Sequence, residues 1–185
     1  MTGQRRHDDR LLDALEEIGP TPYEGIMWRV VRAVDDRSPL DGSRGAGRWN
    51  PASLSVLYGA VEADGAIAEI HHHISLGEPV FPSRIRHNLF ELRVNVAETL
   101  AFADLNALAA LGVEKERYRE MLYSRTQEIA AAAAFMGFHG IVAPSARWQC
   151  QNVILFLDQL GDLDETIEEV NSTPVDWKDW RSKNA

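Results

Sequence analysis

The chain has 185 residues, of which 45% are hydrophobic and 25% are charged; this suits a globular domain with a real core and excludes a largely disordered chain. Its formal net charge of -9 argues against broad nucleic-acid binding, which needs a basic face, but leaves room for a local arginine cluster that binds a small anion. The single cysteine, Cys150, excludes an internal disulfide framework and favours a reducing, intracellular compartment.

The chain carries no pattern of a targeting or membrane-spanning segment. Residues 1–19 contain basic residues and then an amphipathic, acidic run, rather than the apolar core and cleavage site of a signal peptide. The alanine-rich run 130–134 is much shorter than the roughly 18 residues that span a bilayer. We therefore expect a cytoplasmic protein without membrane contact, in which Cys150 is a buried structural residue.

The first half of the chain alternates helical and strand patterns. Apolar residues recur at helical spacing over 8–18, where an aspartate can cap the helix. Segments 25–34 and 53–60 have the β-branched and large apolar residues of strands, and the loop 35–47 between them contains three glycines. The pattern of 62–74 is helical again.

The second half continues in the same mixed way. We predict strands over 89–96, 140–144 and 152–158, a short helix over 103–111 and the longest helix over 114–136. The tail that follows carries Trp177 and Trp180, which we expect to pack on the same molecule. No internal repeat is visible, so we predict a single α+β domain over residues 1–185, with a compact mixed β-sheet core and flanking helices.

The stretch GAGRWN, residues 45–50, resembles a phosphate-binding loop only superficially. It lacks the third glycine of a dinucleotide fingerprint and the Lys-Ser/Thr pair of a P-loop. A flexible turn is the simplest interpretation, although Arg48 at the loop exit suits an anion. We expect Trp49 to anchor the core.

Three consecutive histidines, His71 to His73, raise the question of a metal. Neighbouring side chains on a helix point about 100° apart, so these three cannot converge on one ion without other partners. The spacing matches no HExxH motif, and the solitary cysteine supplies no CxxC. We therefore predict no metal site.

The helix predicted over 62–74 has a polar face with two carboxylates. Glu62, Ala66, Glu69 and His73 follow one another at steps of four, three and four residues, so they share one side of the helix. A solvated face is the simplest interpretation; a carboxylate that projects into a cleft, opposite the strand with Tyr58, is the functional one. Position alone does not choose between Glu62 and Glu69.

Polar residues in two other places suggest a binding site. Ser145, Arg147 and Asn152 lie on or near a loop between two strands, and Ser145 lacks the GxSxG context of a nucleophile. Arg29 interrupts an apolar strand, where it needs a carboxylate, a ligand or solvent. A structural ion pair is the default expectation for Arg29, and a hydrogen-bonding role is the default for Ser145.

Taken in order, these pieces resemble the RES domain family, named for its Arg, Glu and Ser residues. The resemblance covers roughly residues 25–158, and the GRWNP block is its most specific part. Trp28 stands where the family often has Tyr, and Ala60 where Ser is frequent. The matching blocks are Trp28-Arg29, Gly47-Arg48-Trp49-Asn50-Pro51, Leu57-Tyr58-Gly59-Ala60, Ala66-x-x-Glu69, and Pro144-Ser145-Ala146-Arg147 with Asn152.

The resemblance implies a fold, an activity and a partner. RES domains are similar in fold to ADP-ribosylating toxins, and they are the toxins of bacterial toxin–antitoxin pairs whose antitoxin has a helix-turn-helix domain. Members consume NAD by hydrolysis, by phosphorolysis or by transfer of ADP-ribose to a protein. The resemblance thus implies NAD as substrate, a cognate antitoxin, a possible protein target, and DNA contact only through the antitoxin.

The resemblance also assigns roles to residues. Arg29 and Arg48 bind the NAD phosphates, Tyr58 flanks the nicotinamide, and Glu69 is the acidic residue that stabilises positive charge on the ribose. The same site includes Asn50, Ser145 and Asn152, and it needs no metal.

Two questions remain open at this point. The acceptor of ADP-ribose is water, phosphate or a protein. A solvated loop is the simplest interpretation of residues 75–88; the functional one is that Arg84, Arg86 and His87 in this loop meet an acidic protein target. The alternative to an enzyme is a non-catalytic module that binds a nucleotide or an antitoxin in the same cleft.

Overall fold

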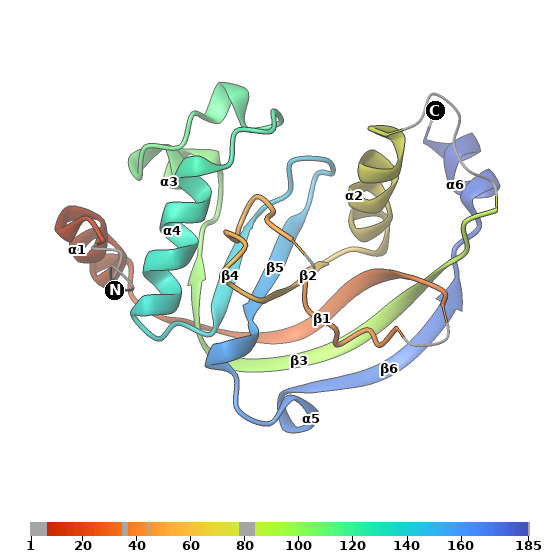
Figure 1. Ribbon diagram of the computed structural model, residues 1–185, viewed down its shortest axis with the longest axis horizontal. Helices are drawn as coiled ribbons and strands as arrows, with labels where there is room; N and C mark the ends of the chain where they lie inside the picture. Colours follow the sequence, from red (N-terminus) through yellow and green to blue (C-terminus); the bar gives the residue numbers. More distant parts are fainter. Residues whose placement is uncertain (1–6, 35–36, 44, 78–83, 185) are drawn as a thin grey trace.

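The computed structural model describes residues 7–34, 37–43, 45–77 and 84–184 and shows an α+β fold, as expected (Figure 1). The described ranges contain strands, α-helices and two 3₁₀ turns, Lys115–Arg117 and Leu157–Gln159. The strands are β1 (Thr21–Arg32), β2 (Val56–Ala60), β3 (His87–Ala101), β4 (Gly140–Pro144), β5 (Gln151–Phe156) and β6 (Ile167–Pro174). The helices are α1 (Asp9–Ile18), α2 (Ala63–Ser75), α3 (Leu105–Ala110), α4 (Ser124–Phe135), α5 (Leu163–Thr166) and α6 (Trp177–Lys183).

The strands form a six-stranded sheet that curls on itself. Its order is β1-β2-β5-β4-β3-β6, and β1 also pairs with β3. The long strand β3 makes this possible, because its residues 87–96 and Thr99 pair with β1, and residues 99–101 pair in parallel with β4. Every other pairing is antiparallel. Residues of β2, β5 and β1 therefore come close to one another, although they are far apart in the sequence.

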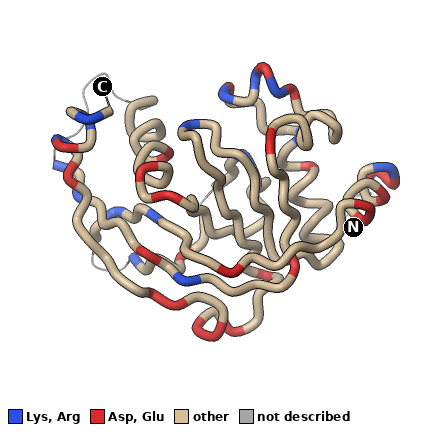
Figure 2. Tube along the Cα trace, turned by 180° about the vertical axis from the view of Figure 1, so that it is seen from behind, with Lys and Arg blue, Asp and Glu red and all other residues tan. Residues whose placement is uncertain are grey.

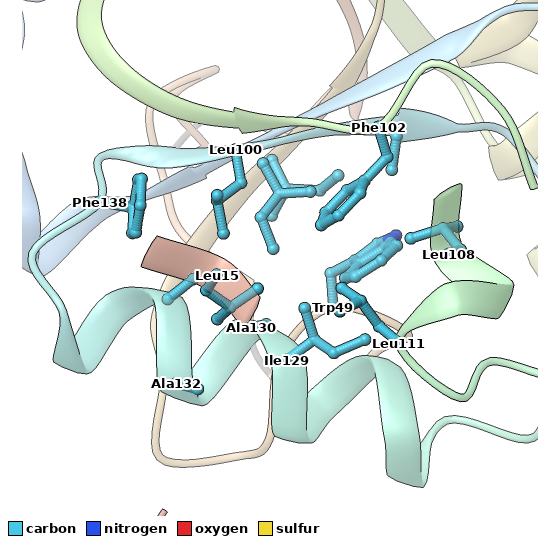
Figure 3. Close-up of a cluster of buried hydrophobic side chains, with 14 of the residues drawn as sticks. Leu15, Trp49, Leu100, Phe102, Leu108, Leu111, Ile129, Ala130, Ala132 and Phe138 are labelled. Atoms are coloured by element: carbon cyan, nitrogen blue, oxygen red, sulfur yellow. The ribbon is translucent and has the colours of Figure 1, made fainter. Parts of the chain in front are cut away.

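Helices lie on two sides of strands β2, β5 and β4. Helices α1, α3 and α4 lie on one side, and α2 and α6 lie on the other (Figure 1). Under α1 and α4, Leu15, Trp49, Phe102 and Ile129 belong to the largest buried cluster, in which the Trp49 and Phe102 rings stack with centroids 6.3 Å apart (Figure 3). Trp49 is only 1% exposed, so it is the core anchor that the sequence predicted.

The C-terminal tail packs on α2 through its tryptophans, as expected. The indole Nε1 of Trp177 donates to Nδ1 of His87 at 3.2 Å, and Nε1 of Trp180 donates to Asp64 Oδ1 at 3.1 Å. The Trp180 ring also lies 6.3 Å from the Trp148 ring. Helix α6 thereby fixes α2 against the sheet.

The predicted helix over 114–136 is wrong in its first half. Only Ser124–Phe135 is α-helical, and a 3₁₀ turn with irregular chain precedes it. Tyr118 is buried and donates its hydroxyl to Pro144 O at 2.8 Å, whereas Leu122 is 46% exposed. The two residues therefore do not share one buried helical face, and the tertiary contact of Tyr118 replaces helical continuity.

Other differences from the expected elements are smaller. Strand β1 begins earlier than predicted, β3 is longer at both ends, and β6 was not predicted as a strand. Cys150 is half-buried rather than buried. In the part of the chain that the structure describes, no helix has the length and apolar character needed to cross a membrane.

Candidate functional site

A cavity of about 230 Å³ opens where β1, β2, α2 and the GRWN loop meet. This volume is below the roughly 300–1,000 Å³ of sites that hold a whole drug-sized ligand, so it suits one part of a dinucleotide. Five residues predicted for the site share its lining, namely Arg29, Arg48, Tyr58, Glu69 and Asn152. The structure therefore brings together residues from positions 29 to 152.

Glu69 is the one carboxylate among the described lining residues, and it is held from one side. Its Oε1 accepts hydrogen bonds from Ser145 Oγ at 2.8 Å and from Asn152 Nδ2 at 2.9 Å. Ser145 Oγ is fixed in turn, because it accepts from the backbone amides of Arg147 and Trp148 at 3.1 and 3.2 Å. Within the described ranges Oε2 of Glu69 has no hydrogen bond, so it is the oxygen left for a ligand.

The geometry favours Glu69 over Glu62 as the acidic residue of the site. Glu62 is exposed at the N-terminus of α2 and does not line the cavity. Its Oε2 accepts from Trp148 Nε1 at 3.3 Å, which ties the start of α2 to the β4–β5 loop. Glu62 thus has a structural contact outside the pocket.

Arg29 lies at the floor of the cavity without the expected ion pair. Its Nη1 donates to Tyr58 O at 2.7 Å and its Nη2 donates to Asp41 O at 2.8 Å, while its buried Nε has no partner. No carboxylate of the described residues forms a salt bridge with it. Burial, together with the nearby charge of Arg37, lowers the pKa of Arg29 to about 10.

Asn50 shapes the pocket from behind rather than lining it. The side chain is 1% exposed, and the two hydrogens of its Nδ2 are shared among four acceptors around the loop that lie within hydrogen-bond distance, including Gly45 O at 2.9 Å and Leu54 O at 3.1 Å. Its Oδ1 accepts from the Tyr58 hydroxyl at 2.8 Å. We therefore assign Asn50 to the folding of the GRWN loop.

The Tyr58 hydroxyl is also engaged in this loop. Besides donating to Asn50, it accepts from the backbone amide of Trp49 at 2.9 Å, and burial raises its pKa. A Cβ on Gly47 would lie 2.8 Å from the hydroxyl oxygen, so the close approach of Tyr58 requires glycine there. The ring of Tyr58, rather than its hydroxyl, is the part available to a ligand.

Arg48 reaches the rim of the cavity from the same loop. Its guanidinium lies over the rings of Tyr118 and Tyr123, 4.5 and 4.8 Å from their centroids, which allows cation–π contacts. The loop itself is fastened to α4: Thr126 Oγ1 donates to Arg48 O at 2.6 Å, and Gln127 Nε2 donates to Gly47 O at 2.8 Å.

Several residues that line the cavity were not predicted from the sequence to belong to the site. Arg37 and Tyr123 line the cavity, and so do Arg147 and His73, which had no predicted role in the site. Arg37 lies in none of the described helices or strands and Tyr123 directly precedes α4, so neither has a periodic pattern that would mark it. Among the described residues, no group of three or more His, Cys, Asp or Glu side chains is placed to hold a metal ion.

Comparison with known proteins agrees with this arrangement. The chain is 35% identical over 83 residues to "Toxin Res" of Pseudomonas putida, a match that covers 45% of this chain and 54%, about half, of that relative. It is 29% identical over 171 residues to a probable NAD(+) phosphorylase of Mycobacterium tuberculosis, with 89% and 80% of the two chains covered.

The same fold occurs in a solved structure. The crystal structure of the M. tuberculosis MbcT–MbcA toxin–antitoxin complex matches with a TM-score of 0.81 and 19% identity, over 95% of this chain and 97% of that one. The model of the RES domain family matches residues 26–178. This chain therefore belongs to the RES domain family.

Proposed function

We propose that this protein is the toxin of a bacterial toxin–antitoxin pair and that it cleaves the bond between nicotinamide and ribose in NAD. The observation that carries the proposal is the position of Glu69: its Oε1 is fixed by Ser145 and Asn152, and its Oε2 is left open, in a cavity that is lined by arginines. The similarity to a probable NAD(+) phosphorylase over 89% of this chain supports the same activity.

The residues match the charges of this reaction. When the C–N bond breaks, its electron pair moves to the nicotinamide nitrogen and neutralises it, while positive charge develops on the ribose, as in glycoside hydrolysis. The Glu69 carboxylate stabilises this charge, and its fixed position avoids reorganisation during the step. Arginines suit the diphosphate because the guanidinium binds phosphate oxygens in pairs, and the Tyr58 ring packs against nicotinamide.

An acceptor oxygen then forms the new bond to the same ribose carbon. With phosphate the product is an ADP-ribose phosphate ester; with water, the proton is released to solvent; with a protein, the ADP-ribose stays on a side chain. We favour phosphate, because the relative that matches most of this chain is a probable NAD(+) phosphorylase. A cognate antitoxin, with a helix-turn-helix domain as the family resemblance implies, would block the cavity.

The test is an assay of nicotinamide release from NAD by the purified protein, with and without phosphate, run alongside labelling of lysate proteins. Phosphate-dependent release is the expected result, and labelling of a discrete protein would point to transfer instead. Glu69→Gln is expected to lower kcat about 100- to 1,000-fold, the usual range for loss of one electrostatic group, with an unchanged melting temperature. Glu62→Gln is the matched control and keeps kcat.

The competing function is a non-catalytic binder. If NAD binds but no nicotinamide is released under any of these conditions, the enzymatic proposal is wrong.

A further inference from the structure

A second cavity, of about 280 Å³, adjoins the first. Five residues line both cavities, so the two share a wall, which is formed by Arg29, Val30, Arg37, Ile70 and His73. The second cavity adds Val31, Arg32, Ile74 and His87. It thus lies between β1, the first residue of β3 and the outer part of α2, away from Glu69.

The lining of the second cavity is basic, on a protein that is acidic overall. Its described lining includes three arginines and two histidines but no Asp or Glu. Many of the acidic residues lie elsewhere: Figure 2 shows them along the outer strand β6, the turn before that strand and the N-terminal helix, although α2 also carries some. Valine and isoleucine side chains make up the rest of the wall, which lowers the local dielectric and strengthens the attraction for an anion.

Two buried donors at the shared wall have no partner among the residues that the structure describes. Arg29 Nε and Arg37 Nε are both shielded from solvent and make no hydrogen bond. Buried donors without acceptors are costly and rare in native proteins. The Arg29 guanidinium is held by two backbone carbonyls, so its direction is fixed before any ligand arrives. An anion bound at the accessible part of these guanidinium groups would reduce the repulsion between the two cations.

His87 supplies a further donor of defined tautomer. The indole N–H of Trp177 donates to Nδ1 of His87, and an indole can only donate. In the neutral ring the proton is therefore on Nε2. Burial and the charge of Arg32 lower the pKa of His87, which keeps this neutral, singly protonated form at neutral pH.

We propose that the cavity formed by Arg29, Arg32, Arg37 and His87 binds a phosphate group. In terms of the proposed function, on which this inference rests, that group is either the free phosphate that accepts ADP-ribose or a phosphate of NAD itself. The two sources share one chemistry, a tetrahedral oxyanion bound by guanidinium forks and an imidazole N–H.

The experiment uses two probes, inorganic phosphate and ADP-ribose, and measures their binding by calorimetry without NAD turnover. Arg32→Gln is the principal variant, because Arg32 is exposed and lines only the second cavity; Arg37→Gln is the second. Loss of one charged contact is expected to weaken binding about 10- to 100-fold. Arg93→Gln, on an exposed part of β3, is the control and leaves binding unchanged.

The two sources give different results. If the cavity holds the phosphate that accepts ADP-ribose, the variants weaken the binding of inorganic phosphate and raise the KM for phosphate, while the KM for NAD stays the same. If the cavity holds a phosphate of NAD, the variants weaken the binding of ADP-ribose and raise the KM for NAD. The inference is overturned if folded Arg32→Gln and Arg37→Gln proteins bind both probes as the wild type does.

The outcome is separable from that of the proposed function. Binding of either probe that depends on Arg32 and Arg37, in a protein that never releases nicotinamide, would support the anion site and overturn the enzymatic proposal.

Discussion

The two sides of the cavity differ in which hydrogen-bonding groups already have a partner within the protein. On the carboxylate side, formed by Glu69, Ser145 and Asn152, the oxygen Oε1 already has two donors. On the arginine side, formed by Arg29 and Arg37, two buried nitrogens have no acceptor within the described part of the chain. Among the described residues, the carboxylate side therefore leaves two acceptors without a donor, Oε2 of Glu69 and the buried Oδ1 of Asn152, whereas the arginine side leaves donors without an acceptor.

This difference has a physical basis in the proposed reaction. Catalysis by a carboxylate depends on its position at the moment when charge develops, so fixing it in advance is useful. An anionic substrate, by contrast, is bound by donors that the protein has not already used. Substitutions on the two sides should therefore affect different quantities, binding on one side and turnover or stability on the other.

After Glu69→Gln, the largest effect is expected for Arg29→Lys. Lysine keeps the charge, but it cannot reproduce the fork that reaches both Tyr58 O and Asp41 O, and it has no counterpart of Nε. NAD affinity should fall about 10- to 100-fold, as for the loss of a charged hydrogen bond. Calorimetry with the slow Glu69→Gln background measures this, and Arg93→Lys is the control. Unchanged affinity would contradict the role given to the arginine side.

Ser145→Ala tests the carboxylate side. It removes one donor to Glu69 and the acceptor of two backbone amides, so kcat should fall about tenfold, and the free energy of unfolding should fall by about 1–3 kcal/mol. The KM for NAD should change little. Ser182→Ala, whose hydroxyl contacts only the exposed α6 backbone at Asp179, is the control. A raised KM with normal kcat would place Ser145 on the binding side instead.

Tyr58→Phe separates loop folding from chemistry. The ring remains, but Asn50 Oδ1 loses its donor and the Trp49 amide loses its acceptor. Denaturant unfolding should show a loss of about 1–3 kcal/mol, with a smaller loss of kcat than in Ser145→Ala. A collapse of kcat at unchanged stability would give the hydroxyl a direct catalytic role.

The smallest effect is expected from pH. Burial lowers the pKa of His87 below the ordinary value of 6.5, so the unfolded chain binds a proton that the folded chain resists, and stability falls as the pH drops below about 6.5. Each unit of difference in pKa corresponds to about 1.4 kcal/mol. His87→Gln keeps an acceptor for Trp177 and should flatten the decline in melting temperature between pH 7.5 and 5.5. The decline should not vanish, because the pKa values of His71 and His72 are lowered too; an unchanged slope would contradict the assignment to His87.

Much of the cavity lining could be predicted, because the residues of the family motif, although far apart in the sequence, meet in space. Glu69 and Asn152 do contact each other, and the resemblance had placed both in one pocket. The same motif did not reveal what Asn50 does, because its partners are carbonyls and hydroxyls whose positions only the folded loop defines. The choice between Glu62 and Glu69 likewise depended on which turn of α2 faces the sheet.

The fold was predictable where burial follows a clear period. Strand β3 alternates buried and exposed residues over much of its length, and its prediction is confirmed apart from its ends. Strand β6 has one buried residue, Ile167, among exposed neighbours, so no alternation marks it. The error over 114–136 arose because Tyr118 is buried by a turn rather than by a helical face.

The packing of α6 gives the protein an internal optical reporter. Three of the five tryptophans, Trp148, Trp177 and Trp180, lie beside α2, and the ring centroid of Trp180 is 6.3 Å from that of Trp148 and 6.4 Å from that of Trp177. Trp148 also touches the start of α2 through Glu62. Intrinsic fluorescence is therefore weighted toward this corner, and displacement of α6, whether by denaturant, by a C-terminal fusion or by a partner, would shift the emission spectrum without any added label.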